Sequence, residues 1–192
     1  MIAYVSGKLA HKDPAFVIVE ANGIGYQIRI SLQTFSALKT ENVKLHTHLM
    51  IKDDAHELYG FHEPSEKKLF QQLISISGVG GNTALTILSS ISPKELYRVI
   101  ETEDLNALKR VKGIGAKTAG RIILELKGKL VTEAGAEEAA GGAGAIRAEA
   151  ISALTSLGLP KAAMEKRVDA ILKKSSGEVT LEALIKEALK QN

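Results

Sequence analysis

The sequence predicts a multidomain α+β protein, in which an N-terminal β-barrel of the OB type precedes a tandem helix-hairpin-helix domain and a C-terminal three-helix bundle. Three observations support this fold class. Strand patterns fill residues 1–63, a 12-residue unit occurs twice within residues 64–131, and helical patterns return in residues 146–192. The 192 residues, 45% of them hydrophobic, are enough for more than one small domain with a buried core.

Residues 1–63 have the pattern of about five short strands. Asn22-Gly23 is a strong hairpin signal, and it lies between apolar runs at 16–20 and 24–30. In the second run apolar and polar residues alternate, which indicates one buried and one exposed face. Five short strands in so short a segment are typical of a small barrel. The other expected elements are strands at 2–9, 43–51 and 58–61 and a short helix at 33–39.

Helical patterning begins after Pro64. We expect Ser65 to cap the first helix and Thr102 to cap the helix that leads into the second copy of the repeat. Ser92-Pro93-Lys94-Glu95 combines an N-cap residue, Pro at the first helical position and Glu at the third, which indicates a helix start.

The duplicated unit spans residues 73–84 and recurs 35 residues later at 108–119. In each copy an apolar helix pattern runs into Gly-Val-Gly or Gly-Ile-Gly, and a new helix begins at once, which is the pattern of a helix-hairpin-helix. The glycines permit positive φ and close backbone approach, and the next helix offers free N–H groups to a phosphate. Such a contact reads the DNA backbone rather than the bases. Ordinary helix turns, each with one capping glycine, do not explain the paired repeat.

The expected DNA contacts are the backbone N–H groups around the glycines, assisted by side chains of the helices that follow. The apolar residue between the glycines is expected to hold the shape of the hairpin. Lys117 and Arg121 lie four residues apart and share a helix face. The complete set is Gly78, Val79, Gly80, Asn82, Thr83, Gly113, Ile114, Gly115, Lys117, Thr118 and Arg121.

The positive charge of the chain is concentrated in the segment that holds both hairpins. The net charge is only +3, but residues 64–131 carry 11 basic and 6 acidic side chains, whereas residues 1–63 carry 6 and 7. This balance favours binding to a phosphate backbone through counterion release. A solvated helical surface can show the same balance, so charge alone supports the hypothesis only modestly.

Nucleotide-binding motifs do not fit the second copy of the repeat. A dinucleotide fingerprint needs Gly at the position of Thr118, and a P-loop needs Gly at the position of Ala116. We therefore expect no nucleotide and no other cofactor on this chain. Cysteine is absent, which excludes disulfides and thiol catalysis and suits the cytoplasm. No apolar run approaches the length of a membrane span, so no membrane partner is expected.

Catalytic and metal-binding patterns are also missing from the sequence. His46 and His48 share a strand face, but no carboxylate lies at a compelling ligand spacing, so we expect no metal site. No nucleophile with an adjacent base and no carboxylate pair in a catalytic context stands out.

Residues 132–145 contain ten Ala or Gly, three Glu and no large apolar side chain. We expect a flexible linker, with transient helix as the alternative because Ala is the best helix former. Residues 146–192 then show helical patterns at 146–157, 160–172 and 180–189. A bundle this small has little room for a catalytic cleft and suits partner docking. The residues expected to contact the partner, with burial as the alternative for each, are Leu157, Leu159, Leu184 and Leu189.

Over its whole length the chain resembles the RuvA family of Holliday-junction-binding proteins. The resemblance rests on residues 1–7, 22–26 and 53–61, on both hairpins, and on the linker and terminal bundle. It implies a homotetramer that holds a four-way DNA junction open and flat, with one or two tetramers per junction. It also implies that the C-terminal domain recruits the hexameric ATPase RuvB, which would carry the ATP chemistry. The RuvC resolvase is a further partner that the resemblance suggests.

The resemblance gives Asp53 and Asp54 the role of an acidic pin at the centre of the tetramer. Carboxylates there would repel phosphates and disfavour uninterrupted duplex. From the residues alone, an ordinary exposed acidic turn is the simpler interpretation. The chain departs from the family pattern at Asn82, where members often carry a basic residue. The first hairpin is therefore expected to rely on backbone groups and to grip less tightly.

The alternative function is a helix-hairpin-helix DNA repair enzyme, either a glycosylase or a nuclease. A glycosylase needs a base-flipping pocket lined by aromatic residues and a catalytic Asp or Lys soon after a hairpin. The chain has four Phe, four Tyr and no Trp, and Glu125 is the only acidic residue soon after the second hairpin. We therefore expect a non-catalytic DNA-binding subunit.

Overall fold

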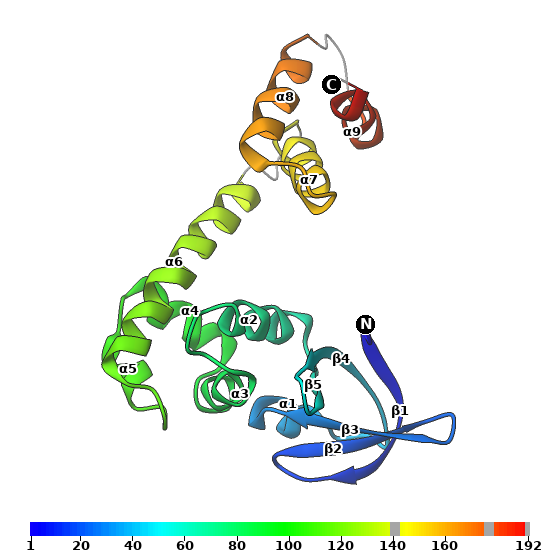
Figure 1. Ribbon diagram of the computed structural model, residues 1–192, viewed down its shortest axis with the longest axis vertical. Helices are drawn as coiled ribbons and strands as arrows, with labels where there is room; N and C mark the ends of the chain where they lie inside the picture. The colour runs from blue at the N-terminus through cyan, green and yellow to red at the C-terminus, as the bar shows by residue number, and fades with distance from the viewer. Residues whose placement is uncertain (139–142, 175–178, 191–192) are drawn as a thin grey trace. The chain divides into compact units, whose positions relative to one another are not determined.

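The computed structural model describes residues 1–138, 143–174 and 179–190, and it forms two compact units, Met1–Gly128 and Lys129–Asn192. The first unit holds a β-barrel and the helices of the duplicated hairpins, and the second holds the C-terminal helices (Figure 1). The predicted fold class is confirmed.

Five strands close the barrel in the order β1-β2-β3-β5-β4. Every neighbouring pair is antiparallel except β3 with β5, which are parallel and pair Arg29 with Tyr59. Asn22 and Gly23, with φ of 53° and 80°, form the predicted hairpin turn. The elements are β1 (Tyr4–Lys12), β2 (Phe16–Ala21), β3 (Ile24–Ile30), α1 (Leu32–Ala37), β4 (Asn42–Ile51) and β5 (His56–Phe61). Val5, Val17, Val19, Ile28, Ile30, Leu38, Val43, Leu45 and Leu58 make the core of the barrel.

The helices α2 and α3 lie next to the barrel, and α4 and α5 lie farther from it (Figure 1). The apolar positions of the repeat are buried in both copies. Leu73 and Leu108, for example, are fully buried at the same place in each unit. The helices are α2 (Pro64–Ile74), α3 (Gly81–Ser90), α4 (Pro93–Glu101), α5 (Leu105–Lys109) and α6 (Ala116–Glu138).

Two of the predicted helix caps are wrong. α2 begins at Pro64 with Glu63 as its N-cap residue, so Ser65 lies inside the first turn. α5 is capped by Asp104, whose carboxylate accepts the backbone N–H groups of Asn106 and Ala107, both at 3.0 Å. Thr102 instead ends α4. A carboxylate at a helix N-terminus is favoured because it meets the positive end of the helix dipole.

Aromatic packing and a buried carboxylate join the barrel to the helices. The ring of Phe70 on α2 lies 4.8 Å from the ring of Tyr59 and 4.9 Å from that of Phe61, and all three are fully buried. Glu66, also on α2, accepts hydrogen bonds from the hydroxyl groups of Ser31 and Thr34 in the barrel domain. Burial raises the pKa of Glu66 above its ordinary value. Residues on both sides of position 63 therefore pack as one compact unit.

The second unit contains α7 (Ala143–Ser156), α8 (Lys161–Lys174) and α9 (Leu181–Lys190). Arg147 and Asp169 join α7 to α8 through two hydrogen bonds of 2.5 and 2.9 Å. Of the described helices, none has the length and apolar character that crossing a membrane requires. The core is built from Ala150, Ile151, Leu154, Met164, Val168, Ile171, Leu184 and Ala188.

The segment expected to be a flexible linker, residues 132–145, is helical where the structure describes it. α6 continues to Glu138 and α7 begins at Ala143, while residues 139–142 lie outside the described residues. The high Ala content accounts for the helix. Residues 132–138 and 143–145 therefore form helix, which was the alternative to a flexible linker.

Candidate nucleic-acid interface

The two hairpin turns have the same backbone geometry. Gly78 and Gly113 both have φ of +89°, the left-handed region that favours glycine. Backbone hydrogen bonds also recur at the 35-residue offset. The N–H of Val79 donates to the carbonyl of Ile76 (3.0 Å), and the N–H of Ile114 donates to the carbonyl of Val111 (3.1 Å). In the same way the N–H of Ala84 donates to the carbonyl of Gly80, and that of Ala119 to the carbonyl of Gly115 (both 2.9 Å). The sequence repeat is thus a structural repeat.

Only the first glycine of each turn has positive φ. The expectation that both glycines serve to permit positive φ is therefore wrong for the second one. Gly80 is the N-cap residue of α3, with φ −86° and ψ 172°, an extended conformation that any residue adopts. Gly115 has no positive φ either. A Cβ atom at either position would meet no atom within 4 Å. The second glycine therefore keeps open the space in front of the following helix.

Val79 and Ile114 lie between the glycines and are buried, with only 5% and 6% of their surface exposed. This burial agrees with the expectation that an apolar residue lies inside the hairpin, and its role in holding the turn stays a prediction. A bound molecule can therefore meet these two residues chiefly through their backbone groups.

The N-terminus of α3 has no side-chain cap. Gly80 provides no side-chain cap, so the N–H groups of Gly81, Asn82 and Thr83 lack a side-chain acceptor from the N-cap. Helix N-termini of this kind bind phosphate through N–H groups and the helix dipole. At the equivalent place on α6, Lys117 is exposed and Thr118 is half-buried.

Arg121 links the two hairpins. Its Nη1 donates a hydrogen bond of 2.8 Å to the carbonyl oxygen of Ser77, in the turn of the first hairpin. The sequence placed Arg121 on one helix face with Lys117 but could not show this contact across 44 residues. A guanidinium has five N–H donors, so Arg121 keeps donors for a phosphate while it holds the turn.

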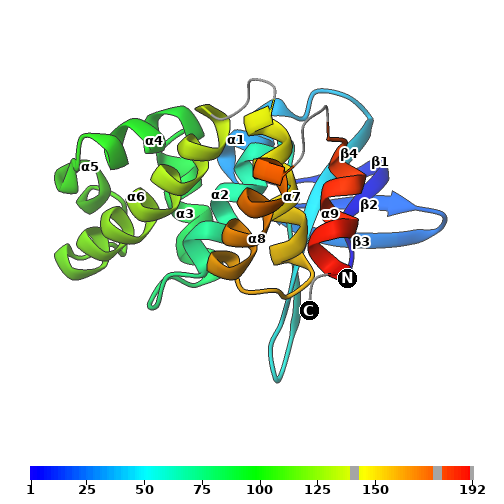
Figure 2. The same cartoon turned by 90° about the horizontal axis from the view of Figure 1, so that it is seen from above.

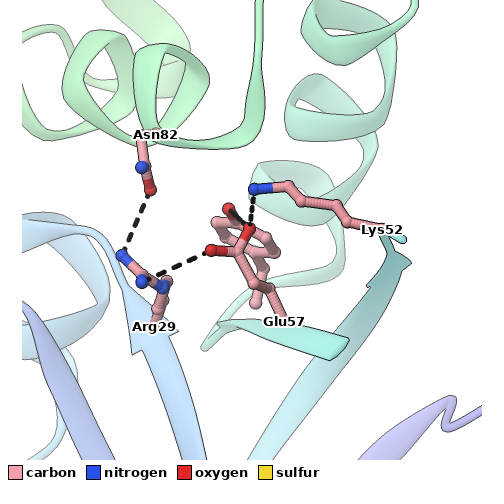
Figure 3. A network of polar contacts seen from close by, with 5 residues as sticks. Arg29, Lys52, Glu57 and Asn82 are labelled. Carbon is pink, nitrogen blue, oxygen red and sulfur yellow. Dashed lines mark hydrogen bonds and ion pairs between the residues drawn. The ribbon is translucent and has the colours of Figure 1, made fainter. Parts of the chain in front are cut away.

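Asn82 belongs to a polar network that joins the first hairpin to the barrel (Figure 3). Arg29 Nη1 donates to Asn82 Oδ1 at 3.3 Å, and Arg29 Nη2 lies 3.4 Å from Glu57 Oε1. Glu57 Oε2 lies 2.6 Å from Lys52 Nζ and accepts the Tyr59 hydroxyl at 2.8 Å. Hydrogen bonds from Lys52 and Tyr59 lower the pKa of Glu57, and burial raises the pKa of Tyr59 to about 12.

Sequence reasoning missed Arg29, Lys52 and Glu57 as neighbours of the first hairpin. Arg29 and Asn82 lie 53 residues apart, and only the packing of α3 on the barrel brings them together. The alternation of polar and apolar residues in β3 placed Arg29 on an exposed face, but no local signal identified what that face meets.

Asp53 and Asp54 are exposed in the turn between β4 and β5. A backbone hydrogen bond of 2.8 Å from Lys52 N–H to the Ala55 carbonyl closes this turn. Figure 2 shows the blue-green connection between β4 and β5 projecting away from the barrel. Two adjacent carboxylates are thus carried on a projecting tip.

The four C-terminal leucines differ in exposure. Leu157 and Leu189 are exposed, at 64% and 47%. Leu159 is half-buried against that core. Leu184 is fully buried within it, so the expectation that Leu184 contacts a partner is wrong, because its side chain fills the bundle.

His46 and His48 are half-buried, and the other three histidines are exposed. His48 lies with its ring edge toward Phe70, at a centroid distance of 5.6 Å, and burial lowers its pKa. Within the part of the chain that the structure describes, no group of three His, Asp or Glu side chains is arranged to hold a metal ion.

Family models cover most of the chain. The model described as the RuvA N-terminal domain matches residues 1–60, a SAM-like helix-hairpin-helix tandem matches residues 70–129, and the RuvA C-terminal domain matches residues 145–191. These matches correspond to the barrel, the duplicated hairpins and the C-terminal helices.

Full-length relatives show the same similarity. A protein of Cytophaga hutchinsonii is 52% identical over 199 residues, covering all of both chains. One from Amoebophilus asiaticus is 48% identical, covering 99% of this chain and all of its own, and one from Bacteroides fragilis is 47% identical over all of both chains. Each is named Holliday junction branch migration complex subunit RuvA. This protein therefore belongs to the RuvA family.

Proposed function

We propose that this protein binds four-way DNA junctions through their phosphate backbones, as the non-catalytic DNA-binding subunit of a branch migration complex. The observation that carries the proposal is the pair of matched hairpin turns, each leading into a helix N-terminus with open space in front of it. The names of the full-length relatives support the same function.

Both hairpins bind phosphates through the N-terminus of the helix that follows the turn. N–H groups of the first turn of α3 and α6 donate to phosphate oxygens, and the exposed ammonium of Lys117 adds a charge. Arg121 contributes from the same helix face and also fixes the first turn through Ser77. Peptide N–H groups carry no base information, so binding is independent of sequence and sensitive to salt.

The proposed assembly is a homotetramer with Asp53 and Asp54 of each copy at the centre of the junction. Their exposure on a projecting turn supports this role. Carboxylates repel phosphates that approach within a few ångströms, so they keep the strands of the four arms apart and disfavour continuous duplex.

The C-terminal helices are the proposed docking module for the RuvB ATPase, which hydrolyses the ATP. Leu157 and Leu189, both exposed, and the half-buried Leu159 support an apolar contact there. RuvC is a further proposed partner on the same junction, and we assign no described residue to it.

A binding experiment tests the junction-binding function. Fluorescence anisotropy measures the affinity of the full-length protein for two four-way junctions of unrelated sequence and for a linear duplex with the sequence of one arm pair. We expect equal affinity for the two junctions, weaker binding to duplex and a steep fall with salt. A strong preference for one junction sequence contradicts the proposal. Strand cleavage in Mg²⁺ favours the alternative, a glycosylase or nuclease.

Two further measurements test the assembly and the partner. Native mass spectrometry with a synthetic junction reports whether one or two tetramers bind. Leu157→Ser with Leu189→Ser is expected to abolish stimulation of the RuvB ATPase while junction affinity stays unchanged. Ile24→Ser, at an exposed apolar residue of the barrel, is the matched control. Normal stimulation by the double variant places the ATPase contact elsewhere.

A further inference from the structure

We propose that Arg29, on barrel strand β3, supplies the positive charge that the first hairpin lacks, and that it binds the phosphate held by the N-terminus of α3. The inference rests on the proposed junction binding and names an additional phosphate-binding residue for it.

The first hairpin is uncharged, although its backbone matches that of the second. No charged residue lies between Lys68 and Lys94. The second hairpin carries five basic residues, Lys109, Arg110, Lys112, Lys117 and Arg121, and the residues 35 positions earlier are Ile74, Ser75, Ser77, Asn82 and Thr86. Every one of these five positive charges is replaced by a neutral side chain. Phosphate binding at the first hairpin thus needs charge from another element.

Arg29 lies beside the position where the charge is missing. Asn82 is the counterpart of Lys117 in the repeat, and its Oδ1 accepts a hydrogen bond of 3.3 Å from Arg29 Nη1. Figure 3 shows the guanidinium of Arg29 between Asn82 and Glu57. Arg29 and Asn82 also line an open groove between the barrel and α3, and the Arg29 side chain is 46% exposed. Its guanidinium is therefore accessible at the start of α3, as the Lys117 ammonium is at the start of α6.

Glu57 holds Arg29 in place without cancelling the charge of the site. Its carboxylate is shared by Arg29 at 3.4 Å and Lys52 at 2.6 Å, so the three side chains together carry a net charge of +1. Asn82 and Glu57 each engage one terminal nitrogen of the guanidinium. Since arginine has five N–H donors in a planar fork that suits phosphate oxygens, donors remain for a ligand.

The test combines a loss of charge with its restoration inside the hairpin. Full-length Arg29→Gln, Asn82→Lys and the double variant are compared with wild type in junction affinity over a range of salt, and in thermal unfolding. Lys8→Gln is the matched control, because Lys8 is an exposed cation of the same barrel that is also paired with a carboxylate, Glu41, at 2.9 Å.

Arg29→Gln is expected to weaken junction binding about tenfold at low salt and to make the salt dependence shallower by about one unit. Asn82→Lys in the Arg29→Gln background is expected to restore both, because it places the cation where the second hairpin has Lys117. Lys8→Gln is expected to change neither.

Unchanged binding by Arg29→Gln overturns the inference. So does a loss that accompanies a lower melting temperature and is not rescued by Asn82→Lys, because Arg29 then acts only in packing the hairpin on the barrel. If the wild-type protein does not prefer junctions to duplex, the proposed function itself is overturned. The wild-type measurement therefore distinguishes a failure of the proposed function from a failure of the inference about Arg29.

Discussion

Replacing Gly80 by Ser changes the space in front of α3 without straining the backbone. Gly80 has φ −86° and ψ 172°, which is a usual conformation for a Ser N-cap residue, and a Cβ atom there meets nothing within 4 Å. The new hydroxyl would accept the N–H of Asn82 or Thr83, since α3 has no side-chain cap. The same side chain would occupy the space that a phosphate needs.

Gly80→Ser is expected to change the free energy of unfolding very little and the affinity for junctions strongly. Ser and Gly differ by only a few tenths of a kcal/mol as N-cap residues, so the free energy of unfolding should change by less than about 0.5 kcal/mol. A hydrogen bond to a charged group contributes about 1.5–3 kcal/mol, so losing one N–H contact with phosphate should weaken junction binding roughly ten- to a hundredfold. Gly78→Ser is the matched control. At φ +89° a Ser is strained by about 1–2 kcal/mol, so this variant should lose stability.

The assay pairs fluorescence anisotropy on a labelled four-way junction with urea unfolding of the free protein. Gly80→Ser should unfold at the wild-type urea concentration and bind weakly, whereas Gly78→Ser should unfold earlier. Wild-type affinity of Gly80→Ser would refute a phosphate site at α3. A loss of stability in Gly80→Ser that equals the loss in Gly78→Ser would refute the turn geometry.

Three further outcomes are expected. Asp53→Asn with Asp54→Asn should raise the affinity for duplex and reduce the preference for junctions, because the carboxylates no longer repel phosphate. If fluorescence anisotropy at low salt gives the same ratio of junction affinity to duplex affinity as wild type, Asp53 and Asp54 form an ordinary acidic turn. Gly81→Ala should cost about 1–3 kcal/mol of unfolding free energy in urea, since its Cβ would meet the buried Tyr59 hydroxyl; the reverse change at the matching position, Ala116→Gly, should cost less than about 1 kcal/mol, and equal costs would argue against the contact. Burial raises the pKa of Glu66 in the folded protein above the ordinary value of 4.5, so the protonated side chain favours the folded state. This contribution to stability is complete below pH 4.5 and is lost as the pH rises through the folded-state pKa. The stability of wild type relative to Glu66→Gln should therefore fall from pH 4 toward neutrality, and a difference independent of pH would contradict this.

Much of the candidate site is predictable because its signals are local. The two Gly-x-Gly turns, the buried residues between the glycines and the helices that follow are each specified within about a dozen residues, and the structure places them as expected. Predictions failed where two local signals competed. Asp104 caps α5 in place of Thr102 because its carboxylate accepts two N–H groups. For Leu184 the sequence left burial and partner contact open, and the side chain is buried in the core that α7, α8 and α9 form.

The order of the domains, the duplicated hairpin and the segment that carries the positive charge follow from the sequence alone, because periodicity, turn residues and composition act over short distances along the chain. The folded structure was needed to show which glycine in each turn has positive φ, that Arg121 donates to Ser77, and that Arg29 donates to Asn82. The two contacts depend on how α6 lies against the turn of the first hairpin and on how α3 lies against the barrel. Contacts across 44 and 53 residues arise from that packing, and no local pattern in the chain encodes them.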